Sequence, residues 1–145
     1  MENKDLASQR RYMRIPITVL NGVLTGTNNE ANAELDRAFN KIIGVAYHEI
    51  TAGGLSTNYR VGFRTDRYTW VDPVNISNWN CNTGVPVEGK FRKFKSEDPK
   101  DRGGIGYGMG DKGYVTVIPG ANLSSDLTGE LVLILERDNT ELPRQ

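Results

Sequence analysis

The chain has few of the residues that tie small proteins together through covalent bonds or metal ions. Its 145 residues include one cysteine, Cys81, and one histidine, His48. A disulfide within the chain is therefore excluded, and a zinc site made from cysteine and histidine lacks ligands. No calcium loop of the form D-x-D-x-D-G is present either. We expect a fold held by an apolar core, with no metal and no cofactor.

Long apolar segments are also missing. The longest unbroken apolar run covers residues 131–135, which is far too short to span a membrane. The first 14 residues, MENKDLASQRRYMR, contain no apolar stretch like that of a secretory signal. The sequence therefore predicts a protein without a membrane span that is made in a reducing cytoplasm and is not secreted by a signal peptide.

Neither sign of charge is in excess. The 18 basic residues balance 18 acidic ones, so the overall basic charge typical of nucleic-acid-binding proteins is absent. The local exception is Arg10, Arg11 and Arg14, which lie close together in a polar segment. We expect residues 1–14 to form a flexible basic arm that contacts nucleic acid or a neighbouring subunit. Residues 15–145 are then expected to form a single domain.

The residues that are abundant are typical of an all-β protein. The chain has 16 glycines and 6 prolines, which separate short apolar runs. Apolar residues alternate with polar or small ones over residues 41–50, 59–64 and 114–118. Residues 130–137 instead form a continuous apolar run, which is typical of a strand buried on both faces.

Residues 30–40 (EANAELDRAFN) are the one segment with helical spacing. Ala31, Leu35, Ala38 and Phe39 fall near one face of a helix of two to three turns. Together with the strand pattern, this predicts an all-β, antiparallel two-sheet sandwich, jelly-roll-like, with an N-terminal arm and one short helix. A closed barrel made of the same strands is the alternative.

Motifs for catalysis are present only in incomplete form. Gly108, Gly110 and Gly113 match G-x-G-x-x-G, but a strand pattern follows where a dinucleotide site requires a helix. His48 and Cys81 have no suitably spaced third group to make a nucleophile and base. A glycosidase-like pair of carboxylates from distant strands stays open, because such pairs leave no local signature. We expect no enzymatic activity.

Aromatic side chains offer a different kind of site. Tyr68, Trp70, Trp79 and Tyr107 could line a surface on which sugar rings stack. Trp70 lies on an alternating segment, which favours a place in the core. Trp79 lies in the polar stretch 75–84 (NISNWNCNTG), and we predict that it is exposed on a ligand-binding loop.

A basic arm, one short helix and about eight short strands with long loops form a recurring arrangement. The pattern resembles single jelly-roll virion proteins, the capsid, penton or spike subunits of tailless icosahedral viruses, including bacteriophages. The resemblance covers residues 41–137. It implies that residues 41–50 open the jelly roll and that residues 130–137 close it beside that strand. It also implies that residues 59–64 pair near residues 114–118 in the other sheet.

The resemblance implies a structural protein that self-associates to build or decorate an icosahedral shell. Its location would be the virion, and its partners would be copies of itself and other virion proteins. Nucleic acid would be reached only through the arm. Balanced charge suits close packing of identical copies, because strong like charge would repel. The alternative is a carbohydrate-binding β-sandwich module that uses Trp79, and an enzyme ranks last.

Overall fold

The computed structural model describes residues 10–54, 58–79, 92–93 and 104–137. Strands account for most of these residues. In chain order the elements are β1 (Arg10–Val19), β2 (Asn29–Glu34), β3 (Lys41–Ala52), β4 (Tyr59–Thr65), β5 (Thr69–Asn75), the 3-10 turn η1 (Ile76–Trp79), β6 (Arg92–Lys93), β7 (Ile105–Gly106), β8 (Lys112–Pro119) and β9 (Leu127–Glu136).

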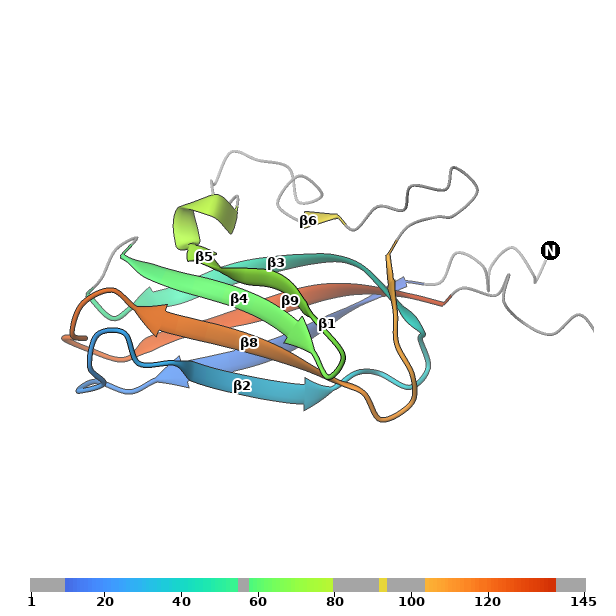
Figure 1. Cartoon of the computed structure of the whole chain (residues 1–145), viewed down its shortest axis with the longest axis horizontal. Coiled ribbons are helices and arrows are strands. Elements are labelled where there is room, and N and C mark those ends of the chain that lie inside the picture. Colours follow the sequence, from blue (N-terminus) through green and yellow to red (C-terminus); the bar gives the residue numbers. More distant parts are fainter. Residues whose placement is uncertain (1–9, 55–57, 80–91, 94–103, 138–145) are drawn as a thin grey trace, which may run out of the picture.

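The strands form two antiparallel sheets that pack face to face (Figure 1). The first sheet has the order β1-β9-β3-β6, and the short strand β7 also pairs with β3. The second sheet has the order β2-β8-β4-β5. The predicted all-β, two-sheet sandwich is therefore confirmed, and the strands do not close into one barrel.

The strands are distributed between the two sheets in the order of a jelly roll, in which most successive strands lie in different sheets and β4 and β5 are neighbours in the same one. β1, β3, β6 and β9 lie in the first sheet, whereas β2, β4, β5 and β8 lie in the second. Two predicted neighbour relations are confirmed, because β3 pairs with β9 and β4 pairs with β8. Residues 41–50 do not open the roll, however, since β1 and β2 precede them.

The predicted helix over residues 30–40 is wrong, because the first half of this segment is strand β2. Ala31 and Ala33 pack against the core, while Glu30, Asn32 and Glu34 are exposed. This is the two-residue period of a strand, and the same residues also satisfy a helical spacing. Pairing with β8 supplies the backbone hydrogen bonds that an isolated segment would obtain from a helix. In the described residues the helical element is instead η1.

The predicted arm is also wrong for its last five residues. Arg10 to Arg14 belong to β1 and pair with β9, from Arg10 opposite Glu136 to Arg14 opposite Val132. The β-domain therefore includes residue 10, and residues 1–9 lie outside the described part. Further along, Pro16 stands opposite Glu130 without interrupting the pairing. β1 extends this far because its partner β9 offers ten consecutive pairing positions.

The core lies between the two sheets and is built from alternate residues of the long strands. Its fully buried side chains come from both layers, and burial of this kind stabilises a fold by about 1.5–3 kcal/mol per large side chain. They include Ile15, Val45, Tyr59, Val61, Phe63, Val115, Val117, Leu127, Leu131, Leu133 and Leu135. β9 also buries Ile134 and Glu136 on its other face, so the predicted burial on both faces is confirmed at the end of this strand, whereas Thr128, Glu130 and Val132 on that face are half-buried.

Gly129 in β9 creates room for a large core side chain from β3. A Cβ atom at this position would fall directly on the Tyr47 hydroxyl and 2.9 Å from the His48 carbonyl oxygen. The Tyr47 ring in turn meets the Tyr59 ring edge to face, with centroids 6.3 Å apart. The two tyrosines thus join the sheets where β9 has no side chain.

We predict that Gly129→Ala lowers the free energy of unfolding by about 1–3 kcal/mol, because the new methyl group overpacks the site. Urea denaturation followed by tryptophan fluorescence measures the change. Gly106→Ala is the matched control, since its Cβ would meet nothing closer than the Asn40 carbonyl oxygen at 4.0 Å. A Gly129 variant as stable as the Gly106 variant would contradict the packing described here.

Candidate functional site

The three arginines predicted to serve the arm lie on β1, and each has an acidic partner. Arg10 Nε is 3.1 Å from Glu136 Oε2, and Arg11 Nη1 is 2.9 Å from Asp36 Oδ2. Arg14 Nε lies 3.4 Å from Glu130 Oε2, a carboxylate that is also 3.2 Å from His48 Nδ1. These contacts neutralise much of the local positive charge. The contact of these arginines with nucleic acid or a subunit stays a prediction.

Trp79 is buried, so the prediction that it is exposed is wrong. Its side chain is 1% exposed, and its indole Nε1–H donates a hydrogen bond to the Val61 carbonyl oxygen at 3.1 Å. The polar neighbours in the sequence indicated a loop, but Ile76 and Trp79 stand three residues apart and are both buried in η1. That apolar spacing is the signal that could have placed Trp79 in the core.

Of the remaining candidate aromatics, Tyr68 is the exposed one. Tyr107 is buried, and its hydroxyl donates to the Asp36 carbonyl oxygen at 2.7 Å. Trp70 is half-buried, and its Nε1–H donates to Thr65 Oγ1 at 2.9 Å. The Tyr68 ring is 64% exposed and lies 4.9 Å from the Trp70 ring, at an interplanar angle of 52°.

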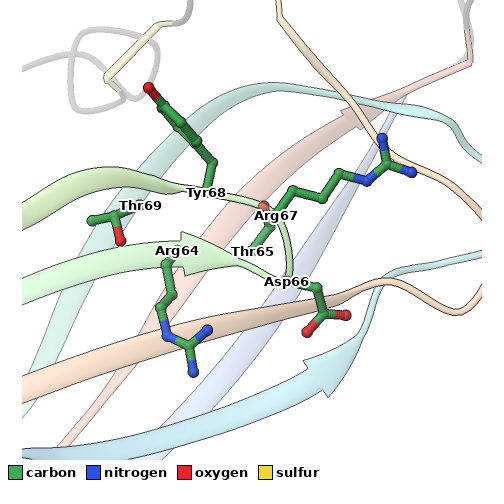
Figure 2. Close-up of a pocket in the computed structure, with 6 residues that line it drawn as sticks. All are labelled: Arg64, Thr65, Asp66, Arg67, Tyr68 and Thr69. Carbon is green, nitrogen blue, oxygen red and sulfur yellow. The ribbon is translucent and has the colours of Figure 1, made fainter.

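A shallow, open depression surrounds the turn between β4 and β5. It is lined by the consecutive residues Arg64, Thr65, Asp66, Arg67, Tyr68 and Thr69 (Figure 2). Figure 2 shows that Arg64 and Asp66 extend to one side of the turn, whereas Tyr68 extends to the opposite side. The lining side chains therefore do not converge on one point, as those of a catalytic pocket would.

Arg64 anchors a network of polar side chains on the outer face of the second sheet. Its guanidinium donates two hydrogen bonds to Glu30, at 2.8 and 3.0 Å, and its Cζ lies 3.8 Å from the centroid of the Tyr114 ring. The Tyr114 hydroxyl donates to Asp66 Oδ1 at 2.7 Å, and the Lys112 amide donates to Asp66 Oδ2 at 2.9 Å. The network thus joins β2, β4, β8 and the β4–β5 turn.

The hydrogen bonds of this network fix the charge of its carboxylates. The Arg64 hydrogen bond lowers the pKa of Glu30 below its ordinary value of 4.5, against the opposing effect of partial burial. The Tyr114 hydroxyl lowers the pKa of Asp66 below 3.8, and the same bond raises the pKa of Tyr114. Such groups keep one protonation state near neutral pH, so the arrangement suits a structural role better than proton transfer.

The two ends of the sandwich differ in charge. At one end, on the left in Figure 1, lie residues 20–28, 50–54, 76–79 and 118–126, in which Asp126 is the one charged residue. We call this the uncharged end. The opposite end has many charged side chains, which include Glu34, Asp36, Arg37, Asp66, Arg67, Asp111 and Lys112. We call this the charged end.

Backbone hydrogen bonds tie the loops of the uncharged end into one surface. The Gly26 amide donates to the Pro119 carbonyl at 2.8 Å, and the Ser124 amide donates to the Gly53 carbonyl at 3.1 Å. The carboxylate of Asp126 accepts a hydrogen bond from the Asn21 amide at 2.8 Å. This hydrogen bond partly compensates the charge of Asp126, and the other residues of these four described segments carry no charge.

Comparison of the chain with protein-family models, with curated proteins and with solved structures finds no match. Within the described residues, no helix is long and apolar enough to cross a membrane. The same part of the chain contains no group of three or more histidine, cysteine, aspartate or glutamate side chains placed to hold a metal ion.

The lowered pKa values predict how stability depends on pH. Glu30 and Asp66 bind protons less readily in the folded chain than in the unfolded chain. Their contribution to the free energy of unfolding is therefore fully present above their ordinary pKa values and is lost as the pH falls below them. We expect the melting temperature to fall between about pH 5 and about pH 3. In the double variant Glu30→Gln/Asp66→Asn the melting temperature, measured by circular dichroism, should fall less steeply with pH than in the wild type.

Asp72→Asn is the control for this measurement, because it removes an exposed carboxylate of β5 outside the network. It should retain the slope of the wild type. A double variant with an unchanged slope would show that the network does not hold these two carboxylates in their ionised form.

Proposed function

We propose that this protein is a non-enzymatic structural subunit of a virion, which associates with copies of itself to build or decorate an icosahedral shell. The jelly-roll strand order supports this proposal, since capsid domains are among the proteins that use it. Fold alone does not define function. The observation that carries the proposal is therefore the uncharged end.

A surface without charge suits contacts between identical copies around a rotation axis. A side chain that lies on such an axis meets the same side chain of a neighbouring copy, so a charge placed there meets its own sign. Like charges placed together in an interface cost several kcal/mol. An assembly with the uncharged end at its axis avoids this cost.

Exposed aliphatic side chains on the uncharged end supply an attraction between copies. Leu20, Leu24 and Ile50 are 61%, 64% and 58% exposed, although each is large and apolar. Burying such side chains against a neighbour removes apolar surface from water, at about 25 cal/mol per Å². Leu20 and Leu24 lie in the β1–β2 connection, and Ile50 lies near the end of β3.

In this proposal the protein is located in the virion, and its partners are copies of itself and other virion proteins. Contact with nucleic acid would come from the N-terminal region. The ion pairs of Arg10, Arg11 and Arg14 would have to open, at least in part, for these side chains to bind phosphate.

We predict that the full chain forms a discrete oligomer and that Leu24→Glu converts it to a monomer. The substitution places one carboxylate per copy near the axis, where the copies repel one another. Size-exclusion chromatography with light scattering, over a range of protein concentrations, measures the mass. Met109→Glu is the matched control, because Met109 is 77% exposed between β7 and β8 at the charged end and should leave the oligomer intact.

Two outcomes would overturn parts of this proposal separately. A wild-type chain that is monomeric at every concentration would contradict the self-associating subunit. A wild-type oligomer that persists in Leu24→Glu would retain self-association but would show that the uncharged end is not the interface.

A further inference from the structure

We propose that the charged end carries a binding site for neutral oligosaccharides, centred on Tyr68 in the β4–β5 turn. This site goes beyond the proposed assembly role and does not depend on it, because it lies at the opposite end of the sandwich (Figure 1). A carbohydrate site was expected at Trp79, but that side chain is buried. The structure provides a different aromatic ring for the same chemistry.

Tyr68 has the exposure and the support that a stacking platform requires. Its ring is 64% exposed, and the neighbouring Trp70 ring lies 4.9 Å away and leans against it. Trp70 is itself held by its hydrogen bond to Thr65 and by packing against the core. A ring whose position is already restricted loses less side-chain entropy when a ligand binds. The apolar face of a pyranose ring can stack on such a surface.

Polar groups on the same turn match the hydroxyl groups of a sugar. Arg67 Nε lies 3.4 Å from Asp111 Oδ2, which joins the β4–β5 turn to the loop between β7 and β8. The Gly108 amide also donates to Asp111 Oδ2 at 2.8 Å and holds the carboxylate in place. A guanidinium next to a carboxylate offers donors and an acceptor together, which is what a pair of adjacent hydroxyls requires.

Gly108 lies next to the Arg67 guanidinium. A Cβ atom at position 108 would lie 3.4 Å from Arg67 Nη2, which is an ordinary van der Waals contact. Arg67 is 68% exposed in its present position. Figure 2 shows Arg67 and Tyr68 extending from the same turn in different directions, so a ligand that contacts both must be extended and follow the turn.

The charges around the turn favour a neutral ligand over an anionic one. Asp111 compensates the charge of Arg67, and Asp66 lies next to it in the sequence. Single-stranded nucleic acid is bound by a groove with excess positive charge and several aromatic rings. Here each of the two arginines has a carboxylate partner, Arg64 with Glu30 and Arg67 with Asp111, so no such excess is present at the turn. A neutral oligosaccharide requires no excess of positive charge, and one ring with a few polar groups is sufficient for a weak site.

The experiment screens the full chain against an array of neutral and anionic oligosaccharides, followed by calorimetric titration of the best neutral ligand. We expect binding that is weakened about tenfold or more in Tyr68→Ala, because the stacking surface is lost. Tyr68→Phe should bind within about threefold of the wild type, since stacking uses the ring and not the hydroxyl. Tyr12→Ala, which removes another exposed tyrosine on β1, is the control and should bind like the wild type.

Three results would overturn this inference. The first is an array without any neutral ligand, and the second is a folded Tyr68→Ala variant that binds as tightly as the wild type. The third is binding restricted to anionic glycans that Arg67→Gln abolishes and Tyr68→Ala does not, which would indicate simple charge attraction. Melting temperatures and elution volumes of all variants verify that a lost signal reflects the site and not the fold.

Discussion

The antiparallel pairing of β9 with both β1 and β3 is the interaction on which the rest of the structure depends. β1 lies at the beginning of the described chain and β9 lies close to its end. The first sheet is therefore complete only when these two ends pair. The strand buries leucines toward the second sheet and Ile134 and Glu136 on the other side. Because contacts so distant in sequence carry a large entropic cost before they form, a fold of this kind is expected to form slowly and cooperatively.

The sequence predicted the long central strands well, because their signals are local and strong. Two patterns each identify a strand and the burial of its side chains. They are the alternation over residues 59–64 and the apolar run within residues 130–137. The segment EANAEL fits both a helix and a strand, and only pairing with β8 decides between them. The end of the arm was missed for a similar reason, since Arg10 to Arg14 are polar and become a strand only beside β9.

The exposure of individual side chains was harder to predict from the sequence than the strands. Trp79 and Tyr68 are both aromatic residues near polar neighbours, yet one is buried and the other exposed, because a turn of 3-10 helix rotates Trp79 toward Val61. The contrast between the uncharged and charged ends is present in the loop sequences. The contrast can be recognised only when the strand order shows which loops lie at the same end of the sandwich. Composition does not contain this information.

The proline in β1 has a consequence for how copies of this chain can meet. β1 is an edge strand, and a long edge strand invites open-ended growth, in which sheets from many molecules join side by side into fibres. Pro16 keeps its place opposite Glu130, so its nitrogen, which bears no hydrogen, faces the free edge and interrupts the row of donors there. Pro16 thereby lowers the capacity of this edge to pair with a strand of another molecule.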